Sequence, residues 1–189
     1  MFLLVFYGPW EVLVPYVVKN DLDGDAGDVG LVYASAGFGA VVAALAMGQR
    51  SLPRRHITVM YASWTLGALV LAAYGLAADV WQAMVAGVFR GAGMTCGLII
   101  WMSLMQTRVP RHLLGRVTSV DWFISIGLVP VSFALTGPVA AAVGAQETLI
   151  GAGVLGAAVT AAFYFLPGIR ETERAAERSS AEGITATDT

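Results

Sequence analysis

Apolar residues along the chain form six long runs, separated by short polar connections. A helix needs about 20 mostly apolar residues to cross a bilayer, because it rises about 1.5 Å per residue through about 30 Å of hydrocarbon. Helices satisfy their own backbone hydrogen bonds in lipid, which contains no water. The pattern therefore predicts an all-α membrane protein of six transmembrane helices. The predicted spans are residues 2–18, 29–47, 57–77, 81–105, 117–143 and 148–166.

The first predicted span is the shortest, and a glycine, two prolines and Glu11 interrupt it. It lacks the cationic start and the small-residue cleavage site of a signal peptide, so we interpret it as a retained span. Beyond the last span, the chain loses its apolar residues and mixes charges of both signs. We therefore expect a six-helix bundle over residues 1–167 and a largely disordered tail over residues 168–189.

Composition indicates that lipid surrounds most of the chain. The 189 residues are 57% apolar and 13% charged, and the charged fraction is about half that of a typical soluble domain. We expect the lipid bilayer as a partner and no nucleic acid, because the net charge of -2 gives no basic field. The single cysteine, Cys96, allows neither a disulfide nor a thiolate metal cluster.

The sequence predicts no metal, no cofactor and no enzymatic activity. The acidic segment 21–28 resembles the start of a calcium loop, but Ala26 replaces the glycine of the loop and Val32 replaces its bidentate glutamate. An enzyme in the membrane would need clustered histidines or acids within the spans. His56 and His112 instead fall in predicted connections, and we interpret them as ordinary loop residues.

Arginines predict the orientation, because Lys and Arg in short loops stay on the cytoplasmic side. They follow the even-numbered spans, whereas the other connections carry mainly aspartate and glutamate. This predicts a multi-pass protein of the cell membrane with both termini in the cytoplasm. The arginines in question are Arg50, Arg54, Arg55, Arg108, Arg111, Arg116, Arg170, Arg174 and Arg178.

Two charged residues, Glu11 and Arg90, lie within predicted spans, where charge is costly and usually functional. Counted from the outer ends of their spans, they lie about 10 and 14 Å deep. Opposite charges at similar depth favour pairing. Three interpretations remain open: a water-accessible cavity in which the pair binds substrate or couples protons, an ion pair that only holds two helices together, or an acid close enough to the surface to be hydrated.

Spacing also suggests packing roles. Gly87 and Gly91, and likewise Gly93 and Gly97, are four residues apart, which permits close helix contact. The tryptophans fall mostly toward span ends, where we expect them to anchor the chain at the membrane interface. They are Trp10, Trp64, Trp81, Trp101 and Trp122.

The connection GQRSLPRRH resembles the degenerate second copy of the loop motif of the major facilitator superfamily, G-x-x-x-D-R-x-G-R-R. Gly48, Arg50, Arg54 and Arg55 match in kind, whereas the acid and the second glycine of the motif are missing. The stretch 105–144 is similar to the tenth-to-eleventh helix region of the drug and siderophore exporters, such as the enterobactin exporter, in that superfamily. Its matching residues are Pro110, Gly115, Arg116, Gly137 and Pro138.

The resemblance implies the C-terminal half of a twelve-helix fold, built as two inverted three-helix repeats. It implies that the first and fourth spans, which carry Glu11 and Arg90, line the central cavity. It also implies proton-coupled export of a hydrophobic drug-like or siderophore-like small molecule. Arg50, Arg54, Arg55 and Arg116 look like members of a cytoplasmic latch, with Asp121 as acceptor.

Nothing in the chain resembles the first six helices of that fold. The expected partner is an N-terminal six-helix half or a second copy of the chain. Three explanations stay open: a truncated or misassigned reading frame, a split transporter, or a homodimer, and we favour the first. The alternative function is a non-transporting remnant or an assembly partner that needs a second six-helix half. Transporters of this superfamily alternate between inward-open and outward-open states by rocking one half against the other, which a single half cannot do alone.

Overall fold

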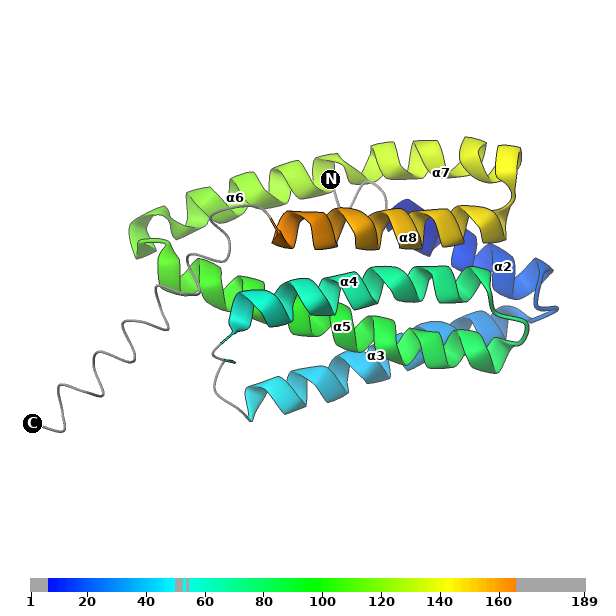
Figure 1. Cartoon of the computed structure of the whole chain (residues 1–189), viewed down its shortest axis with the longest axis horizontal. Helices are drawn as coiled ribbons and strands as arrows, with labels where there is room; N and C mark the ends of the chain where they lie inside the picture. The colour runs from blue at the N-terminus through cyan, green and yellow to red at the C-terminus, as the bar shows by residue number, and fades with distance from the viewer. Residues whose placement is uncertain (1–6, 50–52, 54, 166–189) are drawn as a thin grey trace, which may run out of the picture.

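The computed structural model describes residues 7–49, 53 and 55–165 of the chain, and the secondary structure within these ranges is helical. Most of the described chain runs along one long axis and reverses direction at alternate ends of the bundle (Figure 1). The elements are η1 (Pro9–Leu13), α2 (Val14–Asn20), α3 (Ala26–Gly48), α4 (His56–Gly75), α5 (Val80–Arg108), α6 (Arg111–Gly127), α7 (Val129–Val143) and α8 (Ala145–Tyr164).

Five helical segments are long and apolar enough to cross a membrane. They are α3, α4, α5, the pair α6 and α7, and α8, which cover the second to sixth predicted spans. Part of the first predicted span lies outside the described residues. Its described part is a five-residue π-helix, η1, followed by the seven-residue α2, each with a proline in its first turn.

The fifth span differs most from its prediction. The helix starts at Arg111, six residues earlier than expected, so His112 and Arg116 lie on a helix and not in a connection. It breaks between Gly127 and Val129. Pro130 explains the break, because its ring lacks an N–H group and clashes with the carbonyl four residues earlier.

Glycines set the closest helix contacts, as their spacing predicted. A Cβ atom added at Gly87 or Gly91 would collide with α3, and one added at Gly93 or Gly97 would collide with α4. Two faces of α5 therefore carry two different neighbours, and α8 packs along the far side of α4. The role of these four glycines in close packing is confirmed.

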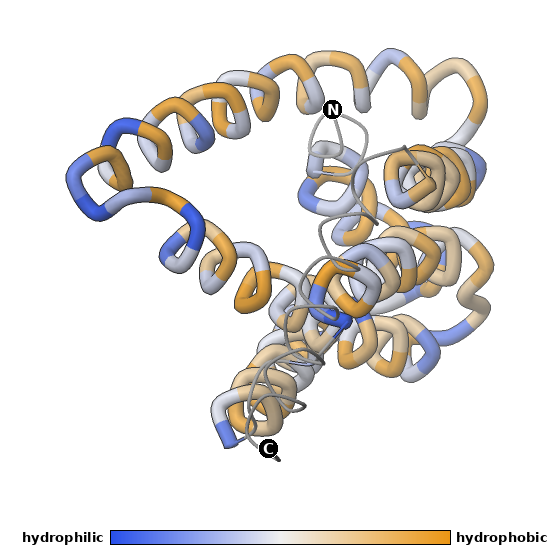
Figure 2. Tube along the Cα trace, turned by 60° about the vertical axis from the view of Figure 1, so that its left-hand side comes forward, coloured by the Kyte–Doolittle hydropathy of each residue, from blue (hydrophilic) through white to orange (hydrophobic). Residues whose placement is uncertain are grey.

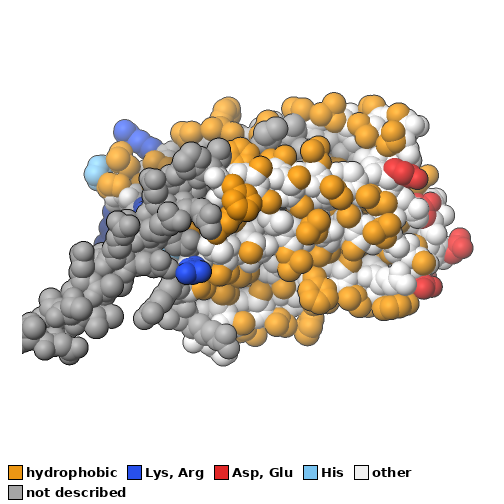
Figure 3. All heavy atoms as spheres, in the orientation of Figure 1, with side chains coloured by type: hydrophobic (Ala, Val, Ile, Leu, Met, Phe, Trp, Pro, Cys, Tyr) orange, Lys and Arg blue, Asp and Glu red, His pale blue; other side chains and the backbone are white. Residues whose placement is uncertain are grey.

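Charge separates between the two ends of the bundle. Acidic side chains gather at the end where α2 meets α3, α4 meets α5 and α7 meets α8, and basic side chains at the opposite end (Figure 3). Hydrophobic side chains cover the surface between the acidic and the basic end (Figure 3). Along the trace, hydrophilic residues gather at the turns and hydrophobic residues lie in the helices between them (Figure 2). The described connections thus place their arginines at one end of the bundle and their acids at the other.

The acidic turn before α3 has a structural role. The Asp25 carboxylate accepts hydrogen bonds from the N–H groups of Gly27 and Asp28, at 2.7 and 2.9 Å. The Asp28 carboxylate accepts one from the Asp25 N–H at 2.9 Å, which completes a capping box. Among the described residues, no group of three or more His, Cys, Asp or Glu could hold a metal ion.

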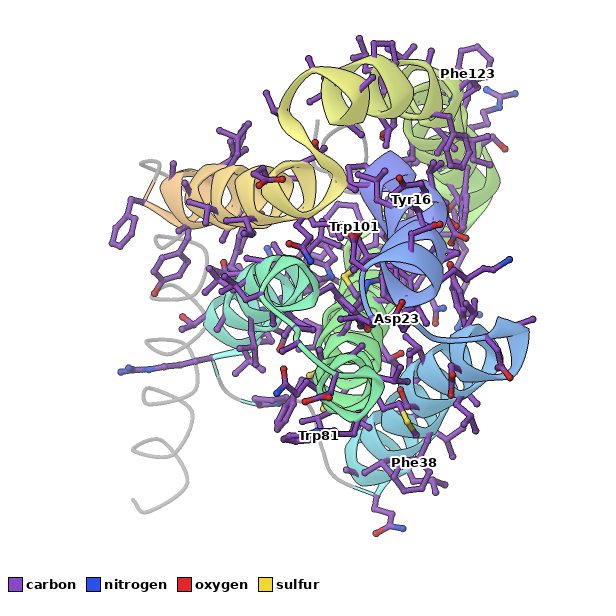
Figure 4. All side chains as sticks on the ribbon, turned by 90° about the vertical axis from the view of Figure 1, so that its right-hand side faces the viewer. Tyr16, Asp23, Phe38, Trp81, Trp101 and Phe123 are labelled. Atoms are coloured by element: carbon purple, nitrogen blue, oxygen red, sulfur yellow. The ribbon has the colours of Figure 1, made fainter. Side chains whose placement is uncertain are left out.

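Helix α6 differs from the other long helices because none of its residues is buried. It stands away from α3 in the tube view (Figure 2). Phe123 on α6 and Phe38 on α3, which are 81% and 64% exposed, lie at the outer edge of the bundle (Figure 4). Both helices present apolar side chains that no described residue covers.

Candidate functional site

The first described helix, η1, is fixed to α7 by a buried hydrogen bond. The N–H group of Gly8 donates to the Ser132 hydroxyl at 2.8 Å. A side chain at position 8 would collide with Ser132 and Thr136, so only glycine allows the two backbones to come this close. This contact holds the turn that carries Trp10 and Glu11 inside the bundle.

Trp10 is the centre of the site and is only 4% exposed. Its ring lies 5.2 Å from the ring of Tyr33 on α3 and 5.2 Å from the ring of Tyr74 on α4, in both cases edge to face. Edge-to-face pairs at this separation are favourable, because the positive ring edge meets the negative ring face. Three elements thus meet around one indole.

Arg90, from α5, places its charge on that indole. Its guanidinium carbon lies 3.6 Å from the centre of the Trp10 ring. A guanidinium at this position is attracted by the negative face of the ring, and the attraction grows when water is excluded. The site therefore joins η1, α3, α4 and α5 around one cation.

Glu11 and the two tyrosines complete the electrostatic surroundings. The half-buried Glu11 carboxylate attracts the Arg90 guanidinium, and both tyrosine hydroxyls lie within electrostatic range of it. The Tyr74 hydroxyl is buried and has no hydrogen-bond partner among the described residues. A buried hydroxyl without a partner costs free energy, so this one is available to water or a ligand.

Depth counting from the sequence predicted that Glu11 and Arg90 meet. The structure brings Arg90 onto Trp10, the residue before Glu11, and the two charges attract each other. The prediction that Trp10 anchors the chain at the membrane interface is wrong, because its indole is buried. Tyr33 and Tyr74 were missed. The sequence did contain a signal for Tyr33. It lies seven residues after the start of α3, and Glu11 lies seven residues before the end of its predicted span, so both lie at a similar depth.

The described residues of the predicted latch lie directly before α4 and on α6. Arg50 and Arg54 lie outside the described residues. Arg55 is exposed directly before α4, and Arg116 is exposed on α6. Asp121 is half-buried on α6 and lies ten residues after Arg111, about 15 Å along that helix.

A comparison with protein families gives one match, to a family of the major facilitator superfamily described as transmembrane secretion effector. It covers residues 2–186, almost the whole chain. Neither a curated protein nor a solved structure matches the chain.

Proposed function

The chain belongs to the transmembrane secretion effector family of the major facilitator superfamily, and on that premise we propose that it forms one six-helix half of a secondary transporter. Membership supports membrane transport and a non-enzymatic role. The proposed reaction is export of a hydrophobic drug-like or siderophore-like small molecule in exchange for protons. Two inverted three-helix repeats would build this half.

The observation that carries the proposal is the pair of charges beside Trp10. Charged side chains inside a bilayer are rare and costly, and they usually mark a substrate or proton pathway. Glu11 supplies a carboxylate that can take up and release a proton, and Arg90 supplies a fixed positive charge. Their mutual attraction means that a change of protonation at Glu11 alters the field at Arg90, which is the coupling that proton exchange needs.

Proton-driven export from vesicles tests this proposal. In everted vesicles that contain the assembled transporter, Glu11→Gln and Arg90→Ala should abolish or retune drug accumulation while membrane insertion stays normal. Matched controls are Glu147→Gln and Arg108→Ala, which change exposed charges of the same kind at the ends of the bundle. Wild-type export by either site variant would show that the pair is only structural.

The arrangement of charge favours one orientation. Basic side chains gather at one end of the described bundle (Figure 3), and the positive-inside rule assigns that end to the cytoplasm. The chain would then lie in the cell membrane with both termini inside. Attachment of a membrane-impermeant maleimide to Asp79→Cys from outside intact cells, and its failure to reach Arg108→Cys, would support this orientation. The reverse labelling pattern would contradict it.

A cytoplasmic latch is proposed on the same premise. Arg50, Arg54, Arg55 and Arg116 would donate to acids of the opposing half, and Asp121 would accept from its arginines. Asp121→Asn should change how readily a cysteine placed beside Glu11, Val12→Cys, reacts with thiol reagents from one side. An unchanged rate would mean that Asp121 is an ordinary helix charge.

The exposed faces of α3 and α6 favour a second role, assembly with another six-helix unit. None of the residues of α6 is buried, although Phe123, Ile124 and Ile126 are large and apolar. We propose that an N-terminal six-helix half or a second copy packs there. A photoactivatable cross-linker attached to Phe123→Cys should capture that unit in membranes, whereas the same reagent on Leu155→Cys, an apolar residue 55% exposed on α8, should not. Equal labelling of both cysteines by a lipid-soluble reagent, without cross-links, would leave lipid as the neighbour of α6.

A further inference from the structure

The groups around the Arg90 guanidinium form a site suited to a positive charge. The face of Trp10 lies 3.6 Å from the guanidinium carbon, and Tyr33 and Tyr74 border the indole at 5.2 Å. An aromatic ring face of this kind binds organic cations, because it carries negative charge, and the Trp10 face is in that position. The carboxylate of Glu11, the residue after Trp10, attracts the same guanidinium.

The same groups are poorly suited to an anion. An anion that approached the guanidinium would meet the carboxylate of Glu11 and the negative face of Trp10, and both repel it. The guanidinium is also engaged already with that face. The chemistry of the site therefore favours a cationic ligand over an acidic one, although its most conspicuous residue is an arginine.

Burial shows which part of the site a ligand reaches first. Trp10 and Tyr74 are 4% and 1% exposed, whereas Arg90 keeps some exposure although its Nε atom is buried. Arg90 is thus the most exposed residue of the three, and its guanidinium lies on the indole face that an incoming cation would need. Because the guanidinium is tethered to α5, it competes with an incoming cation for the Trp10 face at a high effective concentration.

We propose that Arg90 is a tethered occupant of an organic-cation site formed by Trp10, Tyr33, Tyr74 and Glu11, and that a hydrophobic cationic substrate displaces its guanidinium from Trp10. This inference rests on the proposed function, because it takes the Glu11 and Arg90 region as the substrate site. It adds the class of substrate, a bulky monovalent cation with delocalised or shielded charge. In this proposal Arg90 competes with the substrate for the Trp10 face and does not bind the substrate.

Direct binding tests the proposal without requiring transport. Tetraphenylphosphonium is the probe, and its affinity is measured by equilibrium dialysis against the full chain in lipid nanodiscs. Arg90→Gln should raise the affinity about tenfold, which corresponds to about 1.4 kcal/mol and falls within the range for a desolvated cation–π contact. Trp10→Leu should lower the affinity by a similar factor. The control Trp81→Leu removes an indole that is 61% exposed on the surface of α5 and should change nothing.

A second variant, Arg90→Lys, controls for the possibility that loss of the positive charge disturbs folding. Arg90→Lys keeps the positive charge but stacks less well on an aromatic face than a planar guanidinium does. It should give a smaller rise in affinity than Arg90→Gln, in a chain whose charge is unaltered. Equal affinities of the wild type and both Arg90 variants for tetraphenylphosphonium would overturn the proposal. Tighter binding of the anion anilinonaphthalene sulfonate by the wild type than by Arg90→Gln would overturn it too, in favour of an anion site.

The cation site and the transport function can fail separately. If Arg90→Gln binds the probe more tightly but no variant moves it across vesicles under a proton gradient, the cation site stands and the export function is wrong. If vesicles export neutral compounds through a Glu11-dependent route while no variant binds the probe, the export function stands and the cation site is wrong.

Discussion

The contact between α3 and α5 offers the sharpest test of the packing. A Cβ atom added at Gly39 would overlap the carbonyl oxygen of Val88 and lie 2.8 Å from its carbonyl carbon and 2.9 Å from its Cα. Only two residues away on the same helix, Gly37 has no atom within 4 Å of such a Cβ. Gly39→Ala and Gly37→Ala therefore make the same chemical change on one helix in two opposite environments.

The magnitude follows from this geometry. Carbon atoms in contact settle about 3.5–4.0 Å apart, so Gly39→Ala must push α5 away from α3 by about 1 Å. A gap of that size forfeits up to about half of each contact along the interface, and overpacking of this kind costs about 1–3 kcal/mol. Gly37→Ala instead gains about 0.5–1 kcal/mol from the higher helix propensity of alanine. We expect the two variants to change the free energy of unfolding in opposite directions.

Unfolding of the purified chain in lipid nanodiscs measures both variants. Thermal or denaturant curves followed by circular dichroism give the free-energy difference directly. Gly39→Ala should unfold earlier than the wild type, and Gly37→Ala at the same point or later. If Gly39→Ala proved as stable as Gly37→Ala, the close approach of α3 to α5 through glycine would be wrong.

Three further changes test single interactions in the same unfolding assay. Ser132→Ala removes the acceptor of the buried Gly8 N–H and should cost about 1–3 kcal/mol, whereas Ser119→Ala on the exposed surface of α6 should cost nothing. Asp25→Ala removes the capping box of α3 and should cost about 1 kcal/mol, so an unchanged stability would show that the cap is dispensable. Tyr74→Phe removes a hydroxyl with no partner among the described residues and should be neutral or stabilise by about 1 kcal/mol. A clear loss of stability there would mean that the hydroxyl is bound.

The sequence predicts the membrane helices well because bilayer thickness imposes a length on each apolar run. Their ends are predicted less well, as α6 illustrates. Hydropathy places the start of this span at residue 117, since the turn before it carries Arg111, His112 and Arg116. Backbone hydrogen bonds do not depend on apolar side chains, so the helix continues into the polar region and begins at Arg111.

The candidate site was predicted only in part, for a physical reason. Depth along a helix follows from counting residues, so Glu11 and Arg90 could be assigned to one level. The direction in which a side chain points depends on the local helix geometry, and the π-helix at Pro9–Leu13 changes it. Trp10 therefore faces the interior, and the contribution of Tyr33 and Tyr74 appears only once three helices are packed together.

Packing and site are linked through α5. Gly91 follows Arg90 directly and lies against Ala36 of α3, three residues beyond Tyr33. The glycine contact that brings α5 close to α3 therefore also sets the spacing between the guanidinium and the rings around Trp10. A separation of about 1 Å between these helices would weaken a contact that now measures 3.6 Å, because charge–ring attraction falls with distance. A defect made at Gly39, which meets α5 two residues before Arg90, should thus alter cation binding as well as stability, whereas a defect confined to the exposed α6 should alter neither.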